Sequence, residues 1–169
     1  PSSMVDRITP RTTHTLREEV EELFPSRGYN AIQCEEYTQW VIEDKFASDF
    51  PDLTQVGVTI TDDIEPYEET KIRILNGGHT ALAYLGALSG YNTFDQVMNN
   101  EALRNHFKQL QKEEIVPSIE MELPFDINEY VEKIEERFAS TTNHDELERI
   151  CMDGFTKFHT FVVPSLRVC

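Results

Sequence analysis

The chain has 169 residues and carries 31 acidic against 15 basic side chains, which gives a formal net charge of −16. A chain of this length fits one domain, and its negative charge disfavours nucleic acid and anionic membranes as partners because both would be repelled. It has no run of about 18 apolar residues and no signal-peptide pattern, and its three cysteines show no C-x-x-C spacing. We therefore expect a cytoplasmic domain without a membrane span, a disulfide framework or a zinc site.

The first part of the chain is predicted to combine one helix with two short strands. Thr12 or Thr13 can cap a helix to about Phe24, with apolar residues at helical spacing and glutamates on the opposite face. Residues 39–42 and 55–61 are predicted as strands, the second from its alternating apolar residues.

A second helix is predicted to begin near Pro66, a residue favoured in the first helical turn, and to run through Lys71. Gly77 and Gly78 follow in the same apolar segment. Each glycine costs a helix roughly 1 kcal/mol relative to alanine. We therefore expect another backbone or a ligand to approach closely at this point.

The second half of the chain is predicted to be helical. Its helices begin at Asn92 or Thr93, cover about 101–112 and 127–138, and begin again at Thr142 or Asn143. Asp126 with Glu129 resembles a capping box, and Gly154 suits a C-terminal cap of the last helix. The predicted fold class is mainly α with a small β element.

Three polar side chains stand out in the apolar segment around the two glycines. If this segment is an α-helix, Asn76 lies roughly 140° and His79 roughly 80° around the axis from Lys71, so all three fit one face. A lysine can act as a general base when burial favours its neutral form, and asparagine and histidine can hold an alcohol or carbonyl oxygen. The alternative is a solvated lysine, a capping asparagine and a hydrogen-bonded core histidine.

The amino-acid sequence of this segment resembles that of a known family. Pro66-Tyr67-Glu68, Lys71-Ile-Arg-Ile-Leu-Asn76, His79, Ala83-Tyr84 and Gly86 are similar to the signature of the mannitol 2-dehydrogenase family, zinc-free polyol dehydrogenases that use NAD or NADP. Further stretches, at about 4–10, 39–44 and 149–157, match the family in order. The resemblance implies a multihelical C-terminal domain of the 6-phosphogluconate-dehydrogenase-like type over residues 1–169, truncated at its far end.

The resemblance also implies roles for individual residues. Lys71 would be the general base for the alcohol proton, while Asn76 and His79 would hold the reacting oxygen. The other implied residues are Glu68 on the proton path, Arg149 and Lys157 in contact with substrate or cofactor, and Val5 and Asp6 near the cofactor. The alternatives are a solvent-facing first-turn glutamate for Glu68 and a surface ion pair for Arg149 and Lys157.

The expected cofactor is NAD or NADP, with no metal. None of the seven glycines forms the G-x-G-x-x-G turn that binds a pyrophosphate. We therefore expect an N-terminal nucleotide-binding domain outside this chain to be its partner and to hold most of the cofactor. The expected substrate is mannitol or D-arabinitol, although Met152 stands where some mannitol enzymes carry a histidine. A fructuronate or tagaturonate reductase domain, or a non-catalytic helical binding module, remain the alternatives.

Overall fold

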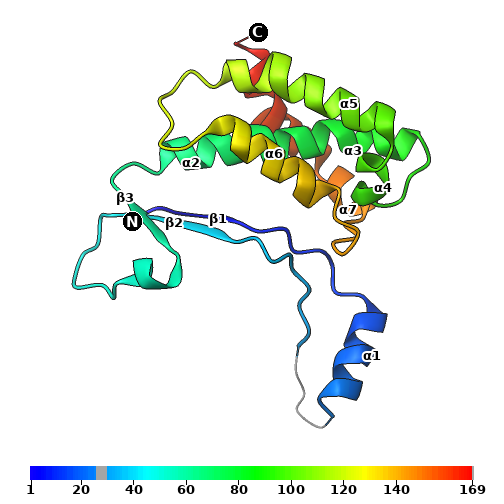
Figure 1. Cartoon of the computed structure of the whole chain (residues 1–169), viewed down its shortest axis with the longest axis horizontal. Helices are drawn as coiled ribbons and strands as arrows, with labels where there is room; N and C mark the ends of the chain where they lie inside the picture. Colours follow the sequence, from blue (N-terminus) through cyan, green and yellow to red (C-terminus); the bar gives the residue numbers. More distant parts are fainter. Residues whose placement is uncertain (26–29, 169) are drawn as a thin grey trace.

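The computed structural model describes residues 1–25 and 30–168. Most of the described chain forms a helical body that lies on one side of a small sheet, and a separate arm extends away from both (Figure 1). The predicted fold class, mainly α with a small β element, is confirmed. Gly28 and Cys169, which entered the glycine and cysteine counts, lie outside the described residues.

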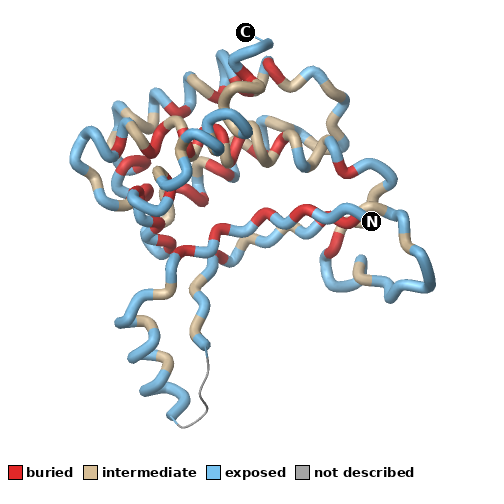
Figure 2. The backbone as a smooth tube through the Cα atoms, turned by 180° about the vertical axis from the view of Figure 1, so that it is seen from behind, coloured by how far each residue is buried: buried red, intermediate tan, exposed pale blue. Residues whose placement is uncertain are grey.

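The sheet contains β1 (Ser3–Asp6), β2 (Gln39–Glu43) and β3 (Thr59–Thr61) in the order β1-β2-β3. The first pair is antiparallel and the second is parallel. Burial alternates along β1, so Met4 and Asp6 are buried while Val5 is 53% exposed. Buried and exposed stretches alternate along the extended ribbon in Figure 2. The predicted strand at 39–42 is confirmed, and β1 carries the chain along one edge of the helical body.

The predicted strand at 55–61 is only partly right. Residues Leu53–Val56 form a 3-10 turn, because the Asp52 side chain accepts a hydrogen bond from the Thr54 backbone N–H at 3.1 Å. Gly57 follows at a φ of 87°, which ends the turn and starts the path into β3. Val56 is 76% exposed, so the alternating apolar pattern does not mark a buried face here.

The arm is the helix α1 (His14–Leu23), which confirms the first predicted helix. Thr13 caps it, since the side-chain oxygen accepts from the Leu16 backbone N–H at 3.2 Å. No residue of α1 is buried. Figure 1 shows why: the arm extends beyond the β1–β2 ribbon and away from the helical body.

One continuous helical run forms the centre of the body. It consists of α2 (Glu65–Thr70), a π-helical segment η2 (Lys71–Gly77) and α3 (Gly78–Leu88). A Cβ atom on Gly77 would lie 2.7 Å from the backbone oxygen of Phe161, and one on Gly78 would overlap the Gln111 side chain. The expected close approach of another backbone at the glycine pair is therefore confirmed.

The remaining helical segments surround this run. They are α4 (Phe94–Met98), α5 (Glu101–Leu110), the π-helical η3 (Gln111–Ile115), the 3-10 turn η4 (Val116–Ser118), α6 (Ile127–Phe138), α7 (Leu147–Cys151), α8 (Gly154–Lys157), the π-helical η5 (Phe158–Val162) and α9 (Val163–Leu166). The helices predicted near 93, 101–112 and 127–138 are confirmed. Asp126 caps α6 as expected, by accepting from the backbone N–H groups of Asn128 and Glu129.

The predicted helix from Thr142 or Asn143 to Gly154 is wrong at both ends. Glu146 forms an isolated antiparallel bridge with Thr93, which holds the chain extended until α7 begins. At the other end Asp153 adopts a φ of 54°, and Gly154 starts α8 instead of capping α7. Glycine is required there by packing, because a Cβ at Gly154 would overlap the Tyr84 hydroxyl.

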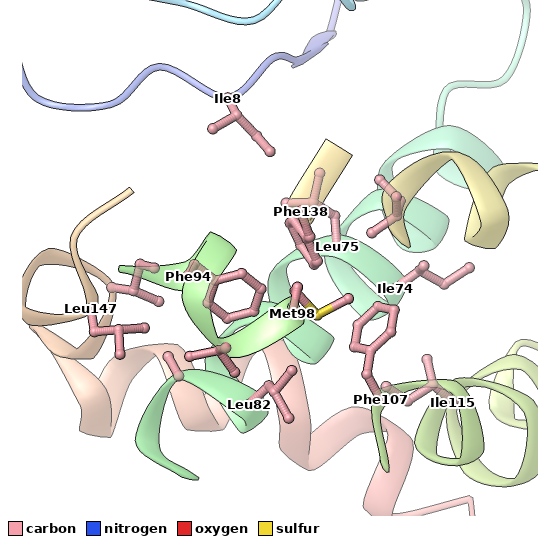
Figure 3. Close-up of a cluster of buried hydrophobic side chains, with 14 of the residues drawn as sticks. Ile8, Ile74, Leu75, Leu82, Phe94, Met98, Phe107, Ile115, Phe138 and Leu147 are labelled. Carbon is pink, nitrogen blue, oxygen red and sulfur yellow. The ribbon is translucent and has the colours of Figure 1, made fainter. Parts of the chain in front are cut away.

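The larger of the two apolar clusters among the described residues lies between these helices. Leu82 and Ile74 come from the central run, Phe94 from α4 and Phe107 from α5, and each is at most 2% exposed (Figure 3). Ile8, just after β1, packs on the same core from the sheet side. Burial of large side chains at these positions is the main favourable contribution to folding, and it fixes the central run against the segment that follows β1.

Candidate functional site

A cavity of about 310 Å³ opens between the segment after β1, the central helical run, and α7 with α8. Six of the eight residues predicted for the site line it: Asp6, Lys71, Asn76, His79, Arg149 and Lys157. Leu75, Ile150 and Phe161 supply apolar parts of the wall. The structure therefore brings residues from both ends of the sequence into one pocket of mixed polar and apolar character.

Lys71 and Asn76 lie on the π-helical segment and face the cavity. Among the described residues, neither side chain has a hydrogen bond or an ion pair, so their polar atoms are available to a bound molecule. π-helical segments often occur at functional sites. The face predicted from α-helical spacing is thus retained, although the segment that carries Lys71 and Asn76 has the wider π-helical turn.

His79 reaches the cavity from the first turn of α3, and its side chain is 12% exposed. The imidazole ring lies 4.7 Å from the Phe138 ring in a stacked arrangement and 4.2 Å from the Phe94 ring, edge to face. Burial, helped by the positive charges of Arg149 and Lys157, lowers the His79 pKa from 6.5 to about 3. The ring is therefore neutral at physiological pH and keeps one N–H donor.

Arg149 on α7 and Lys157 on α8 also line the cavity, and both donate hydrogen bonds within the protein. Arg149 donates from Nε and Nη2 to the carboxylate of Asp145, at 2.8 and 2.6 Å to Oδ1. Lys157 Nζ donates to the carbonyl oxygen of Ile150 at 2.9 Å, near the end of α7. The ion pair considered as the alternative for Arg149 is present, and it lies in the wall of the cavity.

Asp145 is a pocket residue that the sequence analysis missed. Asp145 is 5% exposed. Its Oδ2 atom lies 3.9 Å from Nε2 of His79, which is too far for a hydrogen bond. Its spacing of four residues before Arg149 is the sequence signal that could have identified the pair.

Asp6 is fully buried, and its carboxylate is occupied by the protein itself. Arg137 donates to it from Nη1 and Nη2 at 3.0 and 2.7 Å, and the Tyr130 hydroxyl donates at 2.7 Å. Val5 is 53% exposed on the other face of β1, opposite Trp40. Neither side chain of this pair offers a free polar group to the cavity, and their predicted cofactor contact stays a prediction.

Glu68 is exposed on α2 and is not part of the cavity wall. Its predicted place on a proton path therefore has no contact to support it, whereas its position in the first turn of α2 fits a carboxylate stabilised by the helix dipole.

Arg137 joins two buried carboxylates and was also missed. Besides Asp6 it binds Glu35, through Nε at 2.9 Å and Nη2 at 2.6 Å, and its guanidinium lies 4.0 Å from the centre of the Tyr37 ring. Glu35 in turn accepts from the Ile8 backbone N–H at 2.5 Å. This network fixes the segment that forms the sheet side of the cavity, although residues 6, 35 and 137 are too far apart in sequence to suggest a pair.

In residues 1–25 and 30–168, no group of three or more His, Cys, Asp or Glu side chains is arranged to hold a metal ion. Across the same described ranges, none of the helices combines the length and apolar character that crossing a membrane requires.

A helical domain of this kind, with a lysine, an amide and a neutral imidazole on one pocket, has clear relatives. The sequence model of the mannitol dehydrogenase C-terminal domain matches residues 63–169, more than half of the chain. The chain therefore belongs to the mannitol dehydrogenase family.

Individual relatives match nearly the whole chain. A mannitol 2-dehydrogenase of Aspergillus fumigatus is 39% identical over 170 residues, which is 98% of this chain and 34% of that protein. The Pseudomonas fluorescens mannitol 2-dehydrogenase, solved as a ternary complex with NAD and D-mannitol, superposes with a TM-score of 0.88 at 38% identity, over 98% of this chain and 34% of that one. A D-sorbitol dehydrogenase in substrate-free form gives a TM-score of 0.87 at 29% identity, with the same coverage. The chain spans about a third of the length of the curated relatives it matches.

Proposed function

We propose that this chain is the substrate-binding and catalytic part of a dehydrogenase that oxidises a polyol to a ketose with NAD or NADP. The observation that carries this proposal is the convergence of Lys71, Asn76 and His79 on one cavity. Lys71 and Asn76 have no hydrogen-bond partner in the described part of the chain. A general base and two oxygen ligands are the groups that removal of a hydroxyl proton requires.

In the proposed reaction, Lys71 in its neutral form takes the proton of the substrate hydroxyl and becomes an ammonium group. The Asn76 amide and the neutral His79 ring donate hydrogen bonds to the oxygen, which gains negative character as its proton leaves. The C–H bond then breaks and the oxygen becomes a carbonyl. NAD supplies the acceptor of the hydride when it is bound.

The described glycines do not support a dinucleotide site within this chain. Gly77 and Gly78 are covered by the Phe161 backbone and the Gln111 side chain, so they cannot cradle a phosphate. Gly57 and Gly90 have positive φ but do not line the cavity. We therefore propose that an N-terminal nucleotide-binding domain holds most of the cofactor, in keeping with the greater length of the relatives.

The charges of the cavity are compatible with both a polyol and a sugar acid. Arg149 is paired with the Asp145 carboxylate, whereas Arg7 and Lys157 donate to the carbonyl oxygens of Glu35 and Ile150, which carry no charge. Lys157 can therefore meet a substrate carboxylate, and a sugar-acid reductase stays the second candidate. A polyol comes first because the relatives described above are named for polyols. Mannitol, D-sorbitol and D-arabinitol are the polyols to test.

The test is steady-state oxidation of these polyols by the natural full-length protein that carries this chain, followed by the absorbance of NADH. Lys71→Ala should lower turnover by about 10²-fold to 10⁴-fold, the range for loss of a positioned base, and an added primary amine should partly restore it. Lys112→Ala, which removes an exposed lysine outside the cavity, is the matched control. Activity should also survive exhaustive chelation of metals.

The pH dependence separates the base from the oxygen ligands. Oxidation should rise with pH through one ionisation that disappears in Lys71→Ala. Asn76→Ala and His79→Ala should slow the reaction but keep this ionisation, because the His79 pKa of about 3 lies far below the range measured. A Lys71→Ala enzyme with normal turnover and the same pH profile would show that another group is the base.

A further inference from the structure

Asp145 is a buried carboxylate in the wall of the cavity. Its side chain is 6% exposed, and Arg149 is its charged partner, four residues further along the chain. A buried carboxylate is costly unless it is paired and hydrogen-bonded. The pair with Arg149 compensates the buried charge of Asp145. An ion pair that served stability alone would not need to lie at a cavity.

The fold holds the backbone of Asp145 on both sides. Its carbonyl oxygen accepts from the Phe94 backbone N–H at 2.9 Å, and the next residue, Glu146, forms the bridge with Thr93. The preceding residue, His144, adopts a φ of 37°, an uncommon conformation for a residue with a side chain. The carboxylate is therefore a fixed point, held by α4 and by the segment that leads into α7.

Arg149 is the adjustable member of the pair, with a long side chain that is 43% exposed. Its guanidinium is planar and carries five N–H donors in a fixed arrangement. Nε and Nη2 face Asp145. Nη1 has no acceptor among the described residues, and because the group is planar it points away from the carboxylate.

We propose that Asp145 is a positioning residue: it fixes the Arg149 guanidinium so that Nη1 meets the hydroxyl groups of the polyol that lie away from the reacting carbon. This inference rests on the proposed function and adds a determinant of substrate affinity to it. Contacts to a remote part of the substrate are the same in the ground state and the transition state, so their loss raises KM and leaves kcat nearly unchanged. Replacement of Lys71, which acts on the reacting hydroxyl, should lower kcat instead.

The experiment is a double-mutant cycle in the full-length protein, with KM and kcat measured for the best polyol. Asp145→Asn and Arg149→Ala should each raise KM on the order of 10-fold, with kcat within about 3-fold of the wild type. The double variant should show no larger KM than Arg149→Ala, because Asp145 acts through Arg149. Arg149→Lys, which keeps the charge but loses the two-nitrogen pairing, should raise KM as well.

Asp95→Asn is the matched control, since Asp95 is also a buried carboxylate near His144 but does not line this cavity. It should leave KM unchanged, and thermal unfolding shows whether each variant is folded. Two results would overturn the positioning role while the proposed function stands. One is a KM of the double variant that is raised by the product of the two single increases. The other is a fall in kcat at constant KM for Asp145→Asn. A folded wild type that oxidises no polyol would overturn both.

Discussion

Removal of the Arg137 side chain should be among the most destabilising single changes in this chain. Arg137 is 5% exposed, and its guanidinium donates to two carboxylates, those of Asp6 at 0% and Glu35 at 8% exposure. Methionine in its place fills much of the volume but leaves both buried charges without their cation. Loss of one partner of a buried ion pair costs about 3–5 kcal/mol, a large part of the 5–15 kcal/mol by which domains are typically stable.

The assay is equilibrium unfolding of the 169-residue chain in urea, followed by the fluorescence of Trp40. This residue is the only tryptophan and lies in β2, where its ring nitrogen donates to the Ser3 hydroxyl at 2.8 Å. Adding Asp6→Asn to Arg137→Met should recover part of the lost free energy of unfolding, because one uncompensated charge is then removed.

Lys133→Met is the control on the same helix. Its partner Glu136 is exposed, at 69% of the side chain, and exposed pairs contribute at most about 1 kcal/mol. If Arg137→Met lost no more free energy of unfolding than Lys133→Met, the reasoning that the buried network secures the sheet side of the cavity would be refuted.

Three further outcomes are expected. Gly77→Ala should destabilise the chain by about 1–3 kcal/mol in the same urea assay, because the added methyl group would lie 2.7 Å from the Phe161 oxygen; unchanged stability would mean that the two segments separate easily. The free energy of unfolding should fall as the pH is lowered from about 6.5 toward 3, because His79 takes up its proton at a higher pH in the unfolded state than in the folded state. The His79→Phe variant should lose this part of the pH dependence. An imidazole of His79 that titrates by NMR between about pH 5 and 8 would contradict the lowered pKa. The 169-residue chain alone should not bind NADH in a calorimetric titration, whereas micromolar binding would place a nucleotide site within it.

Local signals in the sequence determined much of the helical framework. Caps such as Thr13 and Asp126 act through hydrogen bonds to backbone groups two or three residues away, so their effect can be recognised without the fold. The same holds for Lys71, Asn76 and His79, which share a cavity because they are close along one helical run. The glycine pair also indicated a close contact, although the sequence could not show that the contact is Phe161.

The tertiary structure alone decided the features that depend on residues distant in sequence. Val56 follows an alternating pattern, but an Asp52-capped turn leaves it exposed. Gly154 begins a helix instead of ending one, because the backbone leaves the helical conformation at Met152 and Asp153. The Tyr84 hydroxyl occupies the space that a side chain at position 154 would need. These outcomes depend on which segments meet, and local propensity carries no information about that.

The wall of the cavity was decided in the same way. Arg137 and Asp6 are 131 positions apart, and their ion pair holds the end of β1 against α6. Asp145 reaches the cavity through the backbone bond to Phe94, and only that placement brings its carboxylate between Arg149 and His79. The sequence thus determined which helical run carries Lys71, Asn76 and His79. Long-range packing and buried charge pairs decided what surrounds them, because the cost of an unpaired buried charge depends on the assembled fold.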